Sequence, residues 1–297
     1  MLQKFGPALV AVATFTAAVT LSAAPSKSPK AMSHSIGAPN EGKLADGYHL
    51  EVAPHLRIVP AYAGTDVRWG TRELVELIDR SAREVKKRYP DAILGVGHLS
   101  KKGGGEIDHH HSHESGRDAD LAFYLTDVAG RPALRERFVT IGVNGIANDG
   151  SHLRFDDGRN WALVTALLTD PRAKVTHVFV VSHLRARLLA YGARIGAPIA
   201  LRNKVAEVLM QPHHALPHDD HFHVRIACPG GSPECIEYPL SAGKANALAK
   251  YGSKGKTKLG KPPHKKLVRA RATGIVKIEA PLPVDPTSPS LAPKDDS

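Results

Sequence analysis

Histidines are concentrated in two short windows of this sequence. The chain has 297 residues and 17 histidines, and nine of these lie within residues 109–113 and 213–223. The first window holds His109, His110, His111 and His113, and the second holds His213, His214, His218, His221 and His223. A lone histidine is usually an ordinary core or surface residue. Imidazole is also a common metal ligand and proton carrier, so two clusters indicate a metal site.

The second window ends in residues 221–226, which alternate in the manner of a β-strand. In a strand His221 and His223 point to one face, and Phe222 points to the other, toward the core. The two imidazoles are then about 7 Å apart along the backbone. One of them can bind a metal while the other takes a proton from a metal-activated water, which is the arrangement that a hydrolytic site needs.

The first window supplies the remaining ligands. His113 lies on a loop, and Asp120 follows seven positions later inside a predicted strand, with Gly116 between them to allow a sharp turn. A loop histidine, a strand aspartate and one histidine of the second window together make a His₂Asp zinc site with a fourth position for water. Asp118 shares the face of Asp120, and it is either a hydrogen-bond partner of a ligand histidine or a solvated strand residue.

The elements that must position these residues are helices and strands in mixed order. Thr71 caps a predicted helix whose apolar residues lie between Leu74 and Val85 and which ends at Tyr89-Pro90. Strands are predicted over 93–99, 118–125, 175–181 and 221–226, and further helices over 161–168, 183–191 and 204–210. There is no strict βαβ rhythm. We therefore predict an α+β fold, a single domain around a mainly antiparallel sheet with flanking helices and long loops that carry the zinc site.

The two ends of the chain differ in composition from its middle. Residues 1–24 have a lysine, an apolar run and small residues, which predicts a signal peptide rather than the alternative of a membrane anchor. Residues 25–45 are predicted to be a flexible linker, 46–252 the folded domain that carries the zinc site and 253–297 a disordered basic tail. Residues 241–297, with 12 Lys/Arg and 4 Asp/Glu, carry +8 of the net charge of +11. We expect a periplasmic or secreted protein without a stable membrane span after signal removal.

The chain has two cysteines, Cys228 and Cys235, separated by a turn-rich loop. An even, close pair in an exported protein favours a disulfide. The alternative is a zinc site, but the six-residue gap is longer than zinc-binding pairs typically have.

Several stretches resemble a known family when they are taken in order. The H-x₆-D motif in Ser112–Asp120 and the H-x-H motif that ends His218–His223 are similar to those of the lysostaphin, D-alanyl-D-alanine metallopeptidase and Sonic hedgehog superfamily. The more specific resemblance is to the penicillin-insensitive murein endopeptidases. It is carried by Gly97–Ser100, Phe155-Asp156, Arg159–Leu163 and Pro217–Arg225, and it extends from about Leu74 to Cys235, the cysteine pair included.

The resemblance implies a zinc endopeptidase that acts on bacterial peptidoglycan. It assigns His113, Asp120 and His223 as zinc ligands and His221 as the general base or transition-state stabiliser. It assigns His218 as an assisting residue and His110 as a further active-site histidine. The implied substrate is the D-alanyl–meso-diaminopimelyl cross-link between stem peptides.

Other functions fit part of the pattern. A D,D-carboxypeptidase or dipeptidase on the same scaffold commonly uses a glutamate base, and the H-x-H window contains no glutamate. A non-catalytic, zinc-bearing cell-wall-binding protein would keep the ligands without the auxiliary histidines His110, His218 and His221. An HNH-type nuclease is disfavoured by the export signal, and no nucleic-acid partner is expected. His109 and His111 are interpreted as solvated, and His213 and His214 as loop surface or substrate rim.

Overall fold

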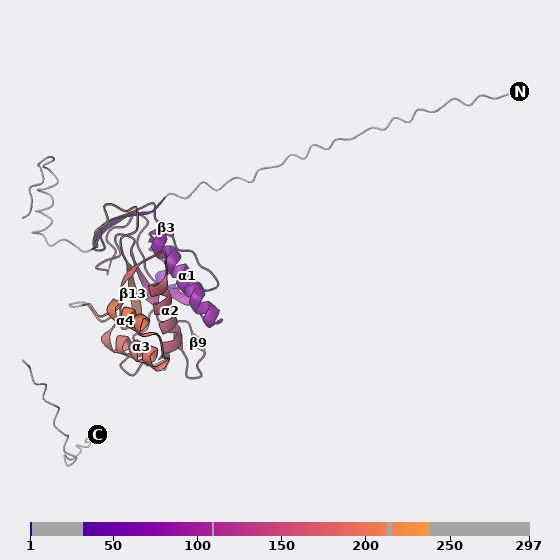
Figure 1. Cartoon of the computed structure of the whole chain (residues 1–297), viewed down its shortest axis with the longest axis vertical. Helices are drawn as coiled ribbons and strands as arrows, with labels where there is room; N and C mark the ends of the chain where they lie inside the picture. The colour runs from indigo at the N-terminus through magenta and orange to yellow at the C-terminus, as the bar shows by residue number, and fades with distance from the viewer. Residues whose placement is uncertain (2–31, 109, 213–215, 238–297) are drawn as a thin grey trace, which may run out of the picture. The chain divides into compact units, whose positions relative to one another are not determined.

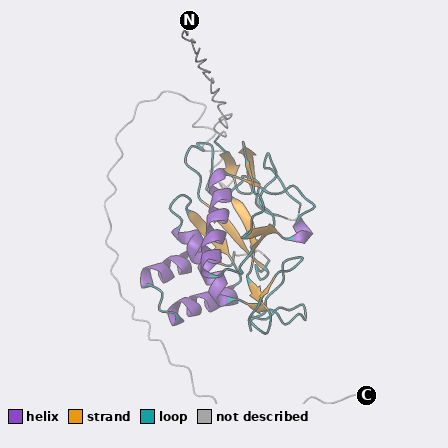
Figure 2. Ribbon diagram, turned by 90° about the vertical axis from the view of Figure 1, so that its right-hand side faces the viewer, coloured by secondary structure: helices purple, strands orange, loops and turns teal. Residues whose placement is uncertain are grey.

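The computed structural model describes residue 1 and residues 32–108, 110–212 and 216–237. Residues 2–24 of the predicted signal peptide, the predicted tail over 253–297, and His109, His213 and His214 lie outside the described residues. Within the described residues, the main features are four α-helices and a mixed sheet of six strands (Figures 1 and 2). This confirms the predicted α+β fold.

The six-stranded sheet has the order β12-β11-β13-β7-β6-β4. Its strands are β4 (Leu56–Ile58), β6 (Leu94–Val96), β7 (Asp118–Ala122), β11 (Val175–Phe179), β12 (Leu209–Met210) and β13 (His221–Ile226). The pairs β11–β13, β13–β7 and β7–β6 are antiparallel, and the outer pairs β11–β12 and β4–β6 are parallel. The sheet is mainly antiparallel, as predicted, and β13 and β7 lie at its centre.

The helices are α1 (Arg72–Arg88), α2 (Asp157–Thr169), α3 (Ser182–Arg194) and α4 (Ile199–Val208). The Thr71 side chain caps α1 by accepting a hydrogen bond from the Leu74 amide, which confirms the predicted start. The helix predicted over 204–210 is wrong at its end. Leu209–Met210 instead forms β12 and pairs with β11, because this short apolar run completes the sheet edge.

The sheet has an apolar face and a polar face. Leu121 of β7 and Phe222 and Val224 of β13 are fully buried in the core that the helices share. Burying a side chain such as Phe222 contributes about 1.5–3 kcal/mol. Since strand side chains alternate, the buried core residues fix Asp118, Asp120, His221 and His223 on the opposite face.

Smaller elements surround the sheet. They are the β1–β2 hairpin (His34–Ala38, Glu41–Ala45), the pair β3 (Tyr48–His49) and β5 (Trp69–Gly70), the 3₁₀ turn Pro60–Tyr62, and the short sheet of β8 (Leu125–Thr126), β9 (Pro132–Ala133) and β10 (Arg154–Phe155). The prediction of a flexible linker over 25–45 is wrong for 34–45, because this segment is the hairpin. Among the described residues, no helix combines the length and the hydrophobicity that crossing a bilayer requires.

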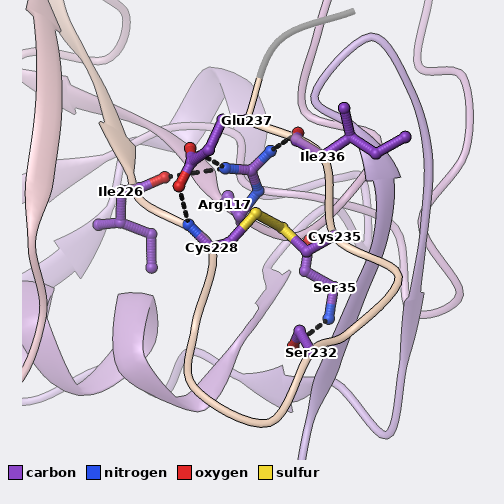
Figure 3. The surroundings of a disulfide bond; sticks show 8 residues. All are labelled: Ser35, Arg117, Ile226, Cys228, Ser232, Cys235, Ile236 and Glu237. Carbon is purple, nitrogen blue, oxygen red and sulfur yellow. Dashed lines mark hydrogen bonds and ion pairs between the residues drawn. A yellow bond between two sulfur atoms is a disulfide. The ribbon is translucent and has the colours of Figure 1, made fainter. Parts of the chain in front are cut away.

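A disulfide between Cys228 and Cys235, as predicted, closes the loop after β13 (Figure 3). The fully buried Arg117 lies beside it and donates to the carbonyls of Ile226 and Ile236 and to the Glu237 carboxylate. The Gly37 amide of β1 donates to the Glu234 carbonyl in the same loop. The disulfide loop therefore ties the end of β13 to the start of β7 and to the hairpin.

Candidate metal centre

One carboxylate oxygen, Oδ1 of Asp120, is the point where the predicted site residues meet. It lies 3.2 Å from His113 Nε2, 3.3 Å from His221 Nε2 and 3.4 Å from His223 Nδ1. Asp120 of β7 is paired directly with His223 of β13. His221 is paired with Ala122, two positions along the same strands, and therefore lies on the same face. The sheet register thus brings together two motifs about a hundred residues apart.

His113 is fully buried, and the loop that holds it has a strained backbone at this residue. Its backbone has a φ of +76°, which is rare for a residue other than glycine and costs about 1–3 kcal/mol. The Ser100 hydroxyl donates to the His113 carbonyl and accepts from the Gly116 amide, which bridges the two sides of the loop. Nδ1 of His113 donates to the Leu99 carbonyl at 2.8 Å, so Nε2 is left to face Asp120.

The β1–β2 hairpin holds the residue after His113. The Glu114 amide donates to the Pro39 carbonyl, and the Gly42 amide donates to the Glu114 carboxylate at 3.1 Å. These bonds cross from the hairpin to the ligand loop. Because the hairpin is in turn bonded to the disulfide loop, the position of His113 depends on both.

His223 is oriented by a buried carboxylate. Its Nε2 donates to Oδ1 of Asp118 at 2.8 Å, and the same oxygen accepts from Nε of Arg225 at 2.6 Å. Burial alone would raise the pKa of Asp118, but Arg225 and His223 lower it, so the group is an anion. With the proton of His223 fixed on Nε2, its Nδ1 lone pair points to the site. The sequence left two roles open for Asp118, a hydrogen-bond partner of a histidine or a solvated strand residue. The structure shows the first: Asp118 is buried and hydrogen-bonded to His223.

His221 lies on the same face and is more exposed than His223, with 19% against 9% of its side chain accessible. Its Nδ1 donates to Asp220 at 2.5 Å, and its ring stacks on Phe138 with centroids 4.8 Å apart. Burial would lower the pKa of His221, but the carboxylates of Asp120 and Asp220 raise it to about 10. This imidazole is thus basic and partly accessible, which suits contact with a substrate.

His110 completes the other side of the cluster. Its Nδ1 lies 3.8 Å from Asp120 Oδ2, and its Nε2 is hydrogen-bonded to Nδ1 of His98 at 2.8 Å. His98 is bonded in turn to the Thr65 hydroxyl at 3.1 Å. Burial, with His113 nearby, lowers the pKa of His110 to about 4, so this imidazole is neutral at pH 7.

His218 lies above the two histidines of β13. Its ring centroid is 5.6 Å from that of His221 and 5.7 Å from that of His223. Burial and the two neighbouring imidazoles lower its pKa to about 4. Its Nδ1 is buried without a hydrogen-bond partner in the described part of the chain.

The donor set fits a metal ion. His113 Nε2 and Asp120 Oδ1 are both buried, face each other and form no hydrogen bond. With its proton on Nδ1, the neutral ring presents a lone pair to a carboxylate lone pair, and this contact is repulsive unless a positive charge lies between them. The pKa of His113 is accordingly raised by Asp120 against the effect of burial. His110, His113 and Asp120, and likewise His218, His221 and His223, have possible ligand atoms within 4.8 Å of one another.

The family description of penicillin-insensitive murein endopeptidases matches residues 35–273 of this sequence. The chain belongs to this family. A penicillin-insensitive murein endopeptidase of Haemophilus influenzae is 26% identical over 182 residues, which cover 59% of this chain and 57% of that protein. The chain therefore spans little more than half the length of this relative. For this member of the murein endopeptidase family, the matched region contains every residue of the centre described above.

The structure brings together all six histidine and aspartate residues that the sequence nominated for the site, namely His110, His113, Asp120, His218, His221 and His223. Three further residues of the centre were not predicted. His98 belongs to a stretch that resembles the family, but nothing in the sequence links it to His110. Tyr62 ends a short 3₁₀ turn and Phe138 lies in an irregular segment, and neither segment has a periodic pattern. Their rings pack on each other with centroids 4.7 Å apart. His111 is exposed, as expected.

Proposed function

We propose that this protein is a zinc-dependent endopeptidase that hydrolyses peptide cross-links of the D-alanyl–meso-diaminopimelyl type in bacterial peptidoglycan. The observation that carries the proposal is the unsatisfied pair of His113 Nε2 and Asp120 Oδ1, with His223 Nδ1 beside it, in a member of this family. A buried cluster of this kind costs free energy unless a cation completes it.

His113, Asp120 and His223 would hold the ion. Two imidazole nitrogens and one carboxylate are the ligands of many catalytic zinc sites, which keep one position open. When bound there, zinc supplies a Lewis acid that polarises the scissile carbonyl and lowers the pKa of a water molecule. We assign His223 rather than His221 as the ligand, because His223 is more buried and its far nitrogen is fixed by the buried Asp118.

His221 would move the proton. With Nδ1 bonded to Asp220, its Nε2 faces Asp120 at 3.3 Å. Once a cation is held by Asp120, this nitrogen would accept a proton from the attacking water and then donate it to the leaving amine. A cation on Asp120 would cancel the attraction between Asp120 and His221. Asp220 then remains as the carboxylate that keeps His221 basic and correctly oriented.

His110 and His218 would bind the substrate by hydrogen bonding. Their lowered pKa values leave them neutral at pH 7, so they add no positive charge beside the cation. Neutral imidazoles can still stabilise the oxygen that gains negative charge in the transition state.

The proposed place of action is the periplasm or the outside of the cell. It is supported by the signal-like composition of residues 1–24 and by the cysteine pair, which forms a disulfide. The proposed partners are the stem peptides of peptidoglycan.

The test is digestion of purified, cross-linked muropeptide dimers, with the fragments identified by mass. We expect wild type to release monomers by cleavage at the D-alanyl–diaminopimelyl bond, and H223A to leave the dimers intact. Tight zinc binding with intact dimers after long incubation would contradict the proposal and favour a cell-wall-binding protein. Release of a terminal D-alanine alone would favour a carboxypeptidase.

A further inference from the structure

A row of residues crosses the polar face of the sheet from the histidines toward its other edge. His221 of β13 is paired with Ala122 of β7, and Arg57 of β4 is paired with Gly95 of β6. The register between β6 and β7 sets Gly95 opposite Ala122. Paired residues point to the same face, so Arg57 and His221 end one row, three strand spacings or about 14 Å apart.

The floor between the two ends of the row is low and partly covered. Gly95 has no side chain, and a Cβ there would lie 2.9 Å from the Ala122 methyl. Phe138 stacks on His221 and also lies over the sheet, since a Cβ on Gly97 would be 2.6 Å from the tip of its ring. The result is a narrow cleft of about 30 Å³ with a largely apolar lining, whose polar and charged members include Arg57, Arg137 and Asp220. This is room for a small group.

The charged side chains of this lining are three arginines and one aspartate, Arg57, Arg135, Arg137 and Asp220. Arg135 forms an ion pair with Asp149 at 2.9 Å, and Asp220 accepts a hydrogen bond from His221. Arg57 donates through Nη2 to the Arg135 carbonyl at 2.5 Å, but its Nε is buried without a partner. Arg137 is exposed at the rim and forms no ion pair within the described ranges. Two guanidinium groups on this lining therefore retain donors without an acceptor in the described part of the protein.

A carboxylate is the group that such donors match. A guanidinium binds a carboxylate through parallel, charge-assisted hydrogen bonds, whereas a single neutral amide oxygen gains much less. We propose that this cleft is a subsite for a free carboxylate of the peptide substrate, within one or two residues of the scissile bond, with Arg57 and Arg137 as its donors. The inference rests on the proposed function. In the proposed cross-link, the diaminopimelyl carbon bonded to the scissile nitrogen bears such a carboxylate.

The test compares two cross-linked dimers that differ in one group, a free or an amidated carboxylate on that diaminopimelyl carbon. We expect wild type to prefer the free acid, on the order of 10- to 100-fold in kcat/KM and mainly through KM, as for loss of a charged hydrogen bond. R137Q and R57Q should lose this preference by acting more slowly on the free acid alone. R172Q should keep it, because Arg172 is an exposed residue in the loop before β11, a strand separated from β6 and β4 by β13 and β7.

The outcomes separate the subsite from the activity. Arg57 also donates a hydrogen bond to the backbone of Arg135, so R57Q could slow cleavage by displacing the loop that contains Arg135. R137Q breaks no such bond, so its effect on the free-acid preference is the decisive test of the subsite. Cleavage of both dimers at equal rates by wild type, or equal slowing of both by R137Q, overturns the subsite and leaves the proposed function intact. If zinc-loaded wild type cleaves neither dimer, the proposed function and the subsite both fail.

Discussion

The carboxylate of Asp118 is predicted to set the metal affinity without touching the metal. Asp118 is fully buried, and its Oδ1 accepts from both His223 and Arg225. D118N keeps the size and an acceptor oxygen but removes the charge that holds the His223 proton on Nε2. Loss of such a partner typically weakens metal binding about 10- to 100-fold, or roughly 1.4–2.7 kcal/mol. The measurement is the zinc Kd by competition with a chromophoric chelator.

The control for D118N is a second buried aspartate in an ion pair. The Asp170 carboxylate accepts two hydrogen bonds from Arg80, at 2.7 and 3.0 Å, and neither residue belongs to the metal centre. D170N should lower the free energy of unfolding but leave the zinc Kd unchanged. The reasoning is refuted if D118N binds zinc as tightly as wild type, or if D170N weakens binding as much as D118N does.

Three further changes have definite expected results. H221Q should lower kcat by roughly 10²- to 10⁴-fold and change the zinc Kd, measured by chelator competition, by no more than a few-fold. If H221Q instead fails to bind zinc, His221 is a zinc ligand and the assignment is wrong. The pair Asp170–Arg80 predicts acid sensitivity: burial would raise the pKa of Asp170, but Arg80 and backbone amides lower it below its ordinary value. Its stabilisation is therefore complete above about pH 4 and is lost as pH falls through the lowered pKa. In urea titrations the gap between wild type and D170N should shrink from pH 7 to pH 3, and a constant gap would contradict this. Replacing Cys228 and Cys235 by serine should cost about 2–3 kcal/mol of unfolding free energy in the same assay, a loss that reduction of wild type should reproduce.

Local patterns in the sequence were sufficient for the elements that carry the site. The Thr71 cap and the apolar spacing after it predicted α1, and the alternation in His221–Ile226 predicted β13 with its two histidines on one face. The H-x₆-D and H-x-H spacings then named the residues that converge on Asp120. These features were predictable because each depends on neighbours in the chain.

The remainder depends on contacts between distant segments. The role of Asp118 was open, since its burial is decided by β13, more than a hundred residues away. The β1–β2 hairpin was missed because its stability comes from the disulfide loop and the loop of His113, not from its own glycine-rich sequence. The bond between His98 and His110, and the stacking of Phe138 on His221, could not be predicted without the tertiary structure.

The central claim is that His113, Asp120 and His223 hold one zinc ion on which cleavage of the cross-link depends. The most direct measurement is a zinc titration of chelator-treated protein, with muropeptide dimer cleavage and bound metal followed together. The account predicts no cleavage without metal and recovery in proportion to zinc up to one ion per chain, with H113A and D120A showing neither binding nor recovery. Full cleavage by metal-free protein, or recovery in H113A equal to wild type, would contradict it.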